Sequence, residues 1–85
     1  MAKVEVYSTM QCPYCVMAKK LLDRKGVAYT EIRVDLDPAK RQEMMKKSRQ
    51  RTVPQIFIND ESIGGYTELV AISNSQRLDK LLVQS

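Results

Sequence analysis

Two cysteines separated by two residues are the feature that most constrains how this chain can fold. Cys12 and Cys15 are the only cysteines in 85 residues, and they stand between a β-type run at residues 4–7 and a helical stretch. Residues at i and i+3 on the first turn of a helix share a face, so the two sulfur atoms can meet in a small disulfide ring. Pro13 suits the first helical position, where its missing N–H costs nothing.

The start of a helix also favours thiol chemistry. Its unpaired N–H groups and partial positive charge stabilise a thiolate, which is the form of cysteine that attacks a disulfide. A Cys-x-x-Cys between a strand and a helix therefore predicts a dithiol/disulfide redox centre at Cys12 and Cys15.

Two other uses of the cysteine pair stay open. One is half of a zinc site, but zinc takes four ligands and the chain has no histidine and no third cysteine, so a second chain or carboxylates would have to complete it. The other is a structural disulfide, which is typical of cysteine-dense secreted domains and constrains little when it closes so short a loop. The redox centre is the leading interpretation, and no metal is expected.

Length and composition predict a single soluble domain spanning residues 1–85. The chain is 44% hydrophobic and 28% charged, which is ordinary for a folded protein with one modest core. The first residues hold no apolar run typical of a signal peptide, and no stretch approaches the roughly 20 apolar residues of a membrane span. A cytoplasmic location without a membrane partner is therefore expected, where thiols stay reduced and a Cys-x-x-Cys is more often catalytic than structural.

The net charge of +4 is concentrated between residues 40 and 51, where Glu43 is the only acid. This segment reads as a solvated helix face, as a surface that attracts a small anion to a nearby site, or as a nucleic-acid surface. No aromatic residue interleaves the charges, which argues against base stacking, and no nucleic acid is expected as a partner. The cations are Lys40, Arg41, Lys46, Lys47, Arg49 and Arg51.

Hydrophobic periodicity and turn signals predict the element order β-α-β-α-β-β-α. Asp37 is expected to cap the second helix and Thr67 the third, which Asn74 and Ser75 interrupt. The strand–helix–strand start predicts a parallel pair and the closing hairpin adds antiparallel strands, which gives an α/β fold with a four-stranded mixed sheet and helices on both faces. Strands are expected at 4–7, 27–34, 56–58 and 61–63, and helices at 13–25, 38–48 and from 67 onward.

The apolar faces of the predicted helices supply the expected core. Met44 and Met45 are expected to fill gaps in it. The other residues expected to face the core are Tyr14, Ala18, Leu21 and Leu22 in the first helix and Leu69, Val70, Ile72, Leu78, Leu81 and Leu82 in the last.

Three motifs occur along the chain, and their combination at these separations is far more specific than any one of them alone. They are Cys12-Pro13-Tyr14-Cys15, Thr52-Val53-Pro54, and Gly64-Gly65 followed by Tyr66-Thr67-Glu68. Together with the length and element order, they resemble the thioredoxin fold and, within it, the dithiol glutaredoxins, most of all the small bacterial class called glutaredoxin 3. The resemblance covers essentially the whole chain. It implies a glutathione-dependent thiol-disulfide oxidoreductase that reduces protein–glutathione mixed disulfides and protein disulfides, as a cytoplasmic monomer.

The resemblance also implies a role for each motif residue. Cys12 is the implied nucleophile, and Cys15, one turn into the helix, is the implied resolving thiol. A cis bond before Pro54, which the sequence alone would leave trans, is implied to place its loop against the cysteines, so that the Val53 backbone can pair with a thiol peptide. The N–H groups after Gly65 are implied to hold a carboxylate of glutathione. The residues implied to bind glutathione are Tyr14, Thr52, Val53, Pro54, Gly65, Tyr66, Thr67 and Glu68.

Two positions depart from the family's pattern. Many glutaredoxins carry a lysine three residues before the first cysteine, where this chain has Thr9, and many carry aspartate where it has Glu68. The lysine's charge can stabilise the thiolate and pair with the glycine carboxylate of glutathione. We hypothesise that Arg51, or more weakly Arg49, takes over this contact, because arginine can grip a carboxylate with two donors.

Two other functions of the same fold stay open. A redoxin reduced by thioredoxin reductase would not need the pocket that Gly64, Gly65 and Glu68 imply. A scaffold that binds an iron–sulfur cluster between two chains is tied in the family mainly to sites with one cysteine, and Pro13 stiffens this site against that role.

Overall fold

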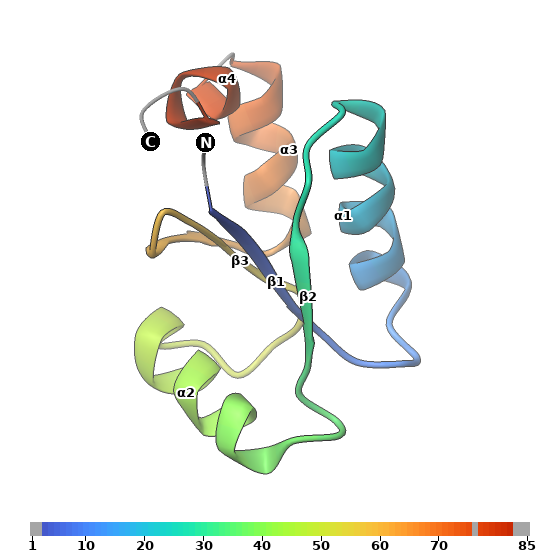
Figure 1. Ribbon diagram of the computed structural model, residues 1–85, viewed down its shortest axis with the longest axis vertical. Helices are drawn as coiled ribbons and strands as arrows, with labels where there is room; N and C mark the ends of the chain where they lie inside the picture. The colour runs from blue at the N-terminus through green and yellow to red at the C-terminus, as the bar shows by residue number, and fades with distance from the viewer. Residues whose placement is uncertain (1–2, 76, 83–85) are drawn as a thin grey trace.

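The strands form one mixed sheet in the order β2-β1-β3-β4 (Figure 1). The computed structural model describes residues 3–75 and 77–82. β1 pairs in parallel with β2, and β3 pairs antiparallel with both β1 and β4, so the predicted mixed sheet is confirmed. The strands are β1 (Val4–Ser8), β2 (Thr30–Arg33), β3 (Gln55–Ile58) and β4 (Glu61–Gly64), and the helices are α1 (Pro13–Arg24), α2 (Pro38–Ser48), α3 (Tyr66–Asn74) and α4 (Arg77–Leu82).

Alternation along β1 sends side chains to both faces of the sheet, and helices cover each face. Val4 and Val6 join a cluster with α1, α3 and α4, whereas Tyr7 joins a second cluster with Met44 of α2. Figure 1 shows α2 apart from the other helices, and the prediction of helices on both faces is confirmed. The first cluster holds Val4, Val6, Ala18, Leu21, Leu22, Ile56, Ile58, Leu69 and Leu78, and the second holds Tyr7, Val34, Met44 and Phe57.

The smaller cluster, under α2, is built from two aromatic rings, a methionine and a valine. The Tyr7 and Phe57 rings meet edge to face with centroids 5.3 Å apart, Met44 is fully buried, and Met45 packs against the group. Lys47 closes the cluster from outside, with its Nζ 4.8 Å from the Phe57 ring centroid. Burial raises the pKa of the Tyr7 hydroxyl. The methionines fill a core, as predicted.

α1 and α2 begin in nearly the same way, each with an extended capping residue followed by a proline. Cys12 has φ −141° and ψ 98°, and Asp37 has φ −139° and ψ 96°. The Cys12 Sγ accepts a hydrogen bond from the Cys15 N–H at 3.1 Å. The Asp37 carboxylate accepts from the N–H groups of Ala39 and Lys40 at 3.1 and 3.3 Å, so the predicted Asp37 cap is confirmed.

Two details of the predicted helices are wrong. Tyr14 is 60% exposed, because the buried stripe of α1 runs through Cys15, Ala18 and Leu22, and a shift of one residue turns a side chain by about 100° around the helix. The third helix is capped by Gly65 instead of Thr67, because its capping position lies two residues earlier than predicted.

The second strand is shorter than predicted, at Thr30–Arg33. Val27 and Tyr29 pack against the core from the connection that precedes the strand, and Gly26 ends α1 with a positive φ of 69°. The interruption at Asn74 and Ser75 is confirmed, since α3 ends there and α4 follows. The predicted core roles of Leu81 and Leu82 concern side chains outside the described part of the structure.

Candidate active site

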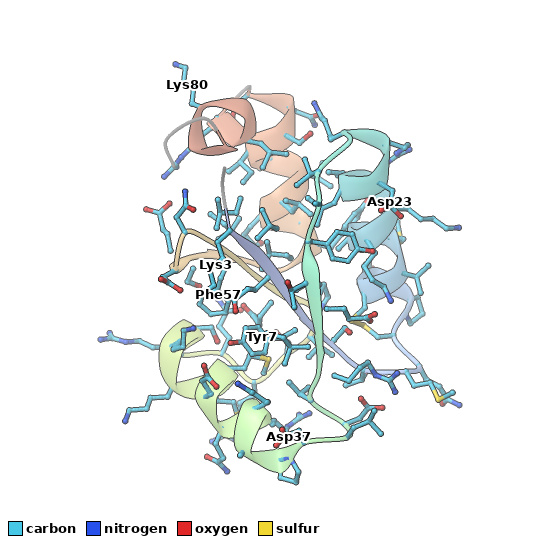
Figure 2. The ribbon with its side chains drawn as sticks, viewed as in Figure 1. Lys3, Tyr7, Asp23, Asp37, Phe57 and Lys80 are labelled. Carbon is cyan, nitrogen blue, oxygen red and sulfur yellow. A yellow bond between two sulfur atoms is a disulfide. The ribbon has the colours of Figure 1, made fainter. Side chains whose placement is uncertain are left out.

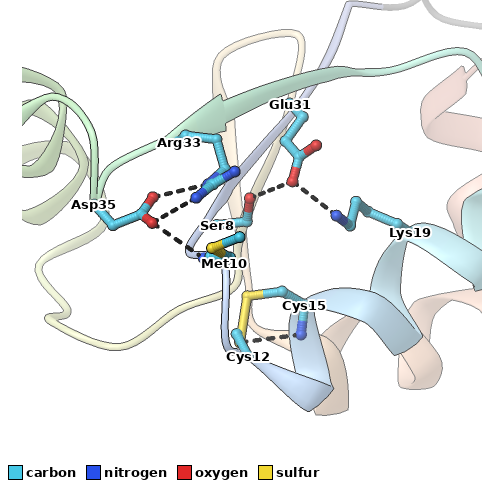
Figure 3. A network of polar contacts seen from close by, with 8 residues as sticks. All are labelled: Ser8, Met10, Cys12, Cys15, Lys19, Glu31, Arg33 and Asp35. Atoms are coloured by element: carbon cyan, nitrogen blue, oxygen red, sulfur yellow. Dashed lines mark hydrogen bonds and ion pairs between the residues drawn. A yellow bond between two sulfur atoms is a disulfide. The ribbon is translucent and has the colours of Figure 1, made fainter.

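A disulfide joins Cys12 and Cys15 at the start of α1 (Figure 3). The two Cα atoms are 5.1 Å apart, within the range that such a bond requires. Cys15 is fully buried, whereas Cys12 is only half-buried. An incoming thiol or disulfide therefore reaches the Cys12 sulfur first.

The surroundings of the Cys12 sulfur favour negative charge on it. The Cys15 N–H points at the sulfur from the first turn of α1, and the helix dipole adds partial positive charge at the same end. The Val53 carbonyl oxygen lies 3.7 Å from the sulfur, and because this oxygen carries partial negative charge, the stabilisation comes from the helix side alone. A helix terminus of this kind stabilises a thiolate when the disulfide is reduced.

The loop before β3 lies against the cysteines, and its Val53–Pro54 peptide bond is cis. The side chain of Gln55 holds this loop in place through hydrogen bonds. Its fully buried Nε2 donates to the Thr52 carbonyl oxygen at 2.9 Å, to the Thr52 hydroxyl at 3.2 Å and to the Gln50 side-chain oxygen at 3.1 Å. Sequence reasoning missed this residue, although a polar side chain beginning an otherwise apolar strand was an available signal.

The start of α3 presents backbone donors beside this loop. Gly64 has a φ of 116°, and a Cβ built on it would lie 2.7 Å from the Glu68 Oε1, so both the backbone and the neighbouring carboxylate require glycine there. The Gly65 N–H donates to the Glu68 Oε1 at 2.7 Å. Gly65 itself has no side chain to cap the next N–H groups of the helix, which therefore remain open to an anion.

A groove of about 270 Å³ runs between this helix start and the loop before β3. Tyr14 and Tyr66 both line it, and their rings stack with centroids 6.0 Å apart and planes at 30°. Gln50 also lines the groove, and the sequence did not single it out. Arg51, by contrast, lines a separate hollow on α2. The residues that line the groove are Tyr14, Gln50, Thr52, Val53, Pro54, Gly65, Tyr66, Thr67 and Glu68.

A carboxylate on β2 ties α1 to the sheet (Figure 3). Glu31 accepts from the fully buried Ser8 hydroxyl at 2.6 Å and pairs with the Lys19 Nζ at 2.7 Å. The hydrogen bonds from Lys19 and Ser8 lower the pKa of Glu31. These three residues come from α1, β1 and β2, so only the fold reveals the contact.

A second carboxylate holds the loop that leads into Cys12. Asp35 pairs with Arg33 at 2.6 Å and accepts a hydrogen bond from the Met10 N–H at 3.2 Å (Figure 3). The hydrogen bond from Arg33 lowers the pKa of Asp35 to about 2. The carboxylate therefore stays ionised near neutral pH, and it keeps its hydrogen bond to the Met10 N–H of the loop.

A buried cysteine, a more accessible cysteine at a helix start, and a groove lined by Val53, whose carbonyl oxygen is 3.7 Å from the accessible sulfur, make a dithiol exchange site. Residues 4–63 match the family model described as glutaredoxin. The chain belongs to the glutaredoxin family. As a glutaredoxin it is a glutathione-dependent disulfide oxidoreductase, with Cys12 and Cys15 as its redox-active pair.

Known relatives match along nearly the whole chain. Glutaredoxin 3 of Escherichia coli (strain K12) is 50% identical over 82 residues, which cover 96% of this chain and 99% of that protein. A glutaredoxin of Pseudomonas aeruginosa is 45% identical over 82 residues, covering 96% of this chain and 98% of that protein.

Solved structures confirm the thioredoxin-like fold. The crystal structure of a buckwheat glutaredoxin–glutathione complex superposes with a TM-score of 0.89 at 30% identity, covering 98% of this chain and 78% of that one. The solution structure of glutaredoxin from Brucella melitensis gives 0.85 at 43% identity, covering 96% and 89%.

Two further observations concern metals and membranes. Across residues 3–75 and 77–82, no three side chains of histidine, cysteine, aspartate or glutamate gather where they would hold a metal ion. Among the helices of the same residues, none is long and apolar enough to cross a bilayer.

Proposed function

We propose that this glutaredoxin reduces protein–glutathione mixed disulfides and protein disulfides through its Cys-Pro-Tyr-Cys site, with glutathione as the reductant. The observation that carries the proposal is the unequal exposure of the two sulfurs beside a groove. Cys12 is half-buried at the helix start and Cys15 is fully buried behind it. An attacking thiol needs access, whereas a resolving thiol needs only its neighbour.

The first step is attack by the Cys12 thiolate on the glutathione sulfur of a mixed disulfide. A bond forms between Cys12 and glutathione, the client's sulfur leaves as a thiolate, and that thiolate takes a proton from water. A second glutathione thiolate then attacks the same glutathione sulfur, which releases oxidised glutathione and restores the Cys12 thiolate. A low thiolate midpoint at Cys12 favours both its attack and its departure.

With a protein disulfide, the second cysteine is needed. Cys12 attacks one client sulfur and forms a mixed disulfide with the client, and the other client sulfur leaves as a thiol. The Cys15 thiolate then attacks Cys12 and releases the client, which leaves the Cys12–Cys15 bond seen in the structure. Two glutathione molecules reduce that bond and become one oxidised glutathione.

Glutathione is proposed to bind in the 270 Å³ groove. Its γ-glutamyl carboxylate takes the open N–H groups at the start of α3, and its cysteinyl backbone pairs with Val53. Glu68 uses one oxygen for the Gly65 N–H, which leaves the other for the ligand's amino group. The buckwheat glutaredoxin solved with glutathione supports this assignment. Tyr14, Thr52, Pro54, Tyr66 and Thr67 shape the walls.

Arg51 is proposed to supply the charge that the family's lysine would supply at Thr9. Its exposed side chain lines the neighbouring hollow, and it lies directly between Gln50 and Thr52, which both line the groove. Arg51→Ala should raise the KM for glutathione, and adding Thr9→Lys should partly restore it. An unchanged KM in Arg51→Ala would show that the arginine does not contact glutathione.

Glu68→Ala should raise the KM for glutathione more than it lowers kcat, because the lost contact is made equally in the ground and transition states.

The decisive test of the proposed function compares Cys12→Ser with Cys15→Ser in a glutathione-coupled assay. Cys12→Ser should have no activity on any disulfide, because the attacking thiolate is gone. Cys15→Ser should keep its activity on glutathione mixed disulfides and lose much of it on protein disulfides. Equal inactivity of both variants on the mixed disulfide would contradict the first step, and turnover with thioredoxin reductase in place of glutathione would favour a reductase-fed redoxin.

The setting proposed for this activity is a single domain of residues 1–85 that works as a cytoplasmic monomer, without a metal, nucleic acid or membrane partner. The site draws on α1, the loop before β3 and α3 of one chain, which supports a monomer. Size-exclusion chromatography with light scattering, and metal analysis of freshly purified protein, test these points. A brown chromophore with a dimeric mass would favour the iron–sulfur scaffold.

A further inference from the structure

A second hollow, of about 770 Å³, lies against α2 and the turn that follows it. We refer to it as the basic hollow. It is larger than the groove at the cysteines, and the reaction proposed above does not use it, apart from the hypothesis about Arg51. Its lining includes Arg41, Glu43, Lys46, Arg49, Gln50 and Arg51.

The cations of the basic hollow are not neutralised within the described part of the chain. None of its three arginines has an ion pair there, nor has Lys46. Glu43 is the only acid in the lining, and it is already paired with Lys40 at 3.3 Å and Lys47 at 3.7 Å. The hollow therefore presents net positive charge to solvent.

The backbone that carries these cations is well held. Arg49 ends α2 in the left-handed conformation at φ 61°, and its N–H donates to the Met45 carbonyl oxygen at 2.8 Å. The Ser48 hydroxyl then accepts from the Gln50 N–H at 3.1 Å, and an Arg41 Nη2 donates to the Arg51 carbonyl oxygen at 3.4 Å. The backbone positions from which these charged side chains extend are therefore fixed.

The basic hollow adjoins the groove at the cysteines. Gln50 lines both. Arg51 precedes Val53 by two residues, which span at most about 7 Å of chain, and the Val53 carbonyl oxygen is 3.7 Å from the Cys12 sulfur. A client peptide whose cysteine reacts at Cys12 reaches the basic hollow with the residues about three to five positions away, at roughly 3.3 Å per extended residue.

We propose that the basic hollow binds an acidic segment of the client polypeptide, close in sequence to the cysteine that reacts. This rests on the proposed function and names the class of client that the site prefers. Carboxylates complement the unpaired arginines, which can grip them with two donors. A nucleic acid fits less well, because no aromatic side chain lines the hollow for a base to stack on.

The test uses peptides that carry one glutathionylated cysteine. One has three glutamates at positions three to five after the cysteine, a second has them before it, and matched controls have glutamines. At low ionic strength, kcat/KM for one glutamate peptide should exceed its glutamine control by roughly tenfold, the lower end of electrostatic steering. The ratio should fall toward one as salt rises, since the Debye length shrinks to about 10 Å at 0.1 M.

The variant Arg41→Gln/Lys46→Gln should lose most of this preference, and Lys46→Gln alone, which changes only an exposed side chain, should lose part of it. The matched control Arg77→Gln/Lys80→Gln removes the same charge from α4, and Figure 2 shows Lys80 at the opposite end of the molecule from Asp37 of α2. The control should keep the preference. All variants should turn over the glutathione mixed disulfide of 2-mercaptoethanol as the wild type does.

Several results would overturn the inference while leaving the proposed function standing. One is equal kcat/KM for the glutamate and glutamine peptides, and another is a preference that survives Arg41→Gln/Lys46→Gln. A loss on the small mixed disulfide as well would assign the charge to glutathione itself. Binding of a labelled single-stranded oligonucleotide that needs Arg41 and Lys46, without peptide discrimination, would assign it to nucleic acid. Turnover of no substrate at all would overturn the proposed function instead.

Discussion

The capping residues of α1 and α2 have nearly the same backbone angles and each is followed by a proline, yet only α1 carries a reaction site. At α2 the capping atom is a carboxylate oxygen of Asp37, which holds two N–H groups of its own helix and is otherwise exposed to water. At α1 the capping atom is the Cys12 sulfur, which has the Cys15 N–H on one side and the Val53 carbonyl on the other. Any helix start supplies partial positive charge, and the residues packed around it determine whether a reaction can take place there.

The neighbours of the two starts come from different ranges of the sequence. The third residue of α1 is Cys15, which supplies a second sulfur, whereas the third residue of α2 is Lys40, which pairs with Glu43 along the same helix. The cis-proline loop and the groove that it lines come to the Cys12 side of α1 from other elements. The site is therefore a common local structure placed at the meeting point of α1, the sheet and α3.

The largest predicted difference between the two starts is in activity. Cys12→Ala should abolish turnover, since no other accessible thiol stands at the groove. Asp37→Ala should leave turnover of a small mixed disulfide unchanged and should lower the free energy of unfolding by about 1 kcal/mol, the usual effect of removing a helix cap. Steady-state kinetics and urea unfolding of the two variants measure both effects.

Asp37→Asn is the matched control for the cap, because asparagine caps helices as well as aspartate does. It should keep nearly the wild-type stability. If Asp37→Ala lost activity while Asp37→Asn kept it, α2 would be positioning the site, and the two helix starts would not be independent.

A smaller effect is predicted when a thiol is moved from one start to the other. In a Cys12→Ser/Cys15→Ser background, the variant Asp37→Cys places a lone thiol at a cap with nearly the same φ and ψ. Its thiolate should form with a midpoint below the roughly 8.5 of a free cysteine, because the helix terminus is the same. It should still show no disulfide turnover, because it has no groove. Alkylation rate against pH measures the first result, and the coupled assay measures the second.

The two helix starts also show what the sequence can predict. Both were predicted correctly, because an N-cap residue followed by proline is a signal contained in two neighbouring positions. Thr67 was the wrong cap for α3, because Gly65 has no side chain and its capping comes from Glu68, three residues later. The predicted groove residues do line one groove, but Arg51 lines the other hollow, and no local signal tells on which side of the loop its side chain lies.

The smallest predicted effect concerns the ionic contacts behind each helix. Glu31 ties α1 to β2 through Lys19, in a pair whose side chains are only 33% and 25% exposed. Glu31→Gln should lower the free energy of unfolding by about 1 kcal/mol at neutral pH, the upper end for such pairs. Glu43→Gln, which removes the exposed pairs with Lys40 and Lys47 within α2, is the control and should cost about 0.5 kcal/mol.

The pH dependence follows from the sign of the shift at Glu31. Its pKa in the folded protein lies below the 4.5 of an ordinary glutamate, so its contribution is complete above pH 4.5 and is lost as the pH falls through the folded value. The difference between wild type and Glu31→Gln should therefore be constant from about pH 6 to 8 and should shrink below pH 4.5. Urea unfolding at several pH values measures it, and a difference that grew in acid would contradict the ion pair.

The contacts of Glu31 mark the limit of sequence reasoning here. Ser8, Lys19 and Glu31 lie on three different elements, and each reads as an ordinary polar residue of its own strand or helix. The buried Gln55, which holds the loop before β3, is similar, since its partners depend on how that loop returns to the cysteines. Local signals identify the reacting atoms, and the packed fold decides what holds them in place.

The most direct test of the chemistry at the start of α1 is the alkylation of the fully reduced protein by iodoacetamide as a function of pH, with mass spectrometry to locate the label. Cys12 should react first, with a midpoint below about pH 7.5, because the helix start stabilises its thiolate. Cys15 should stay largely unlabelled, because it is fully buried. A midpoint above about pH 8, or label appearing first on Cys15, would contradict the assignment of Cys12 as the attacking thiolate.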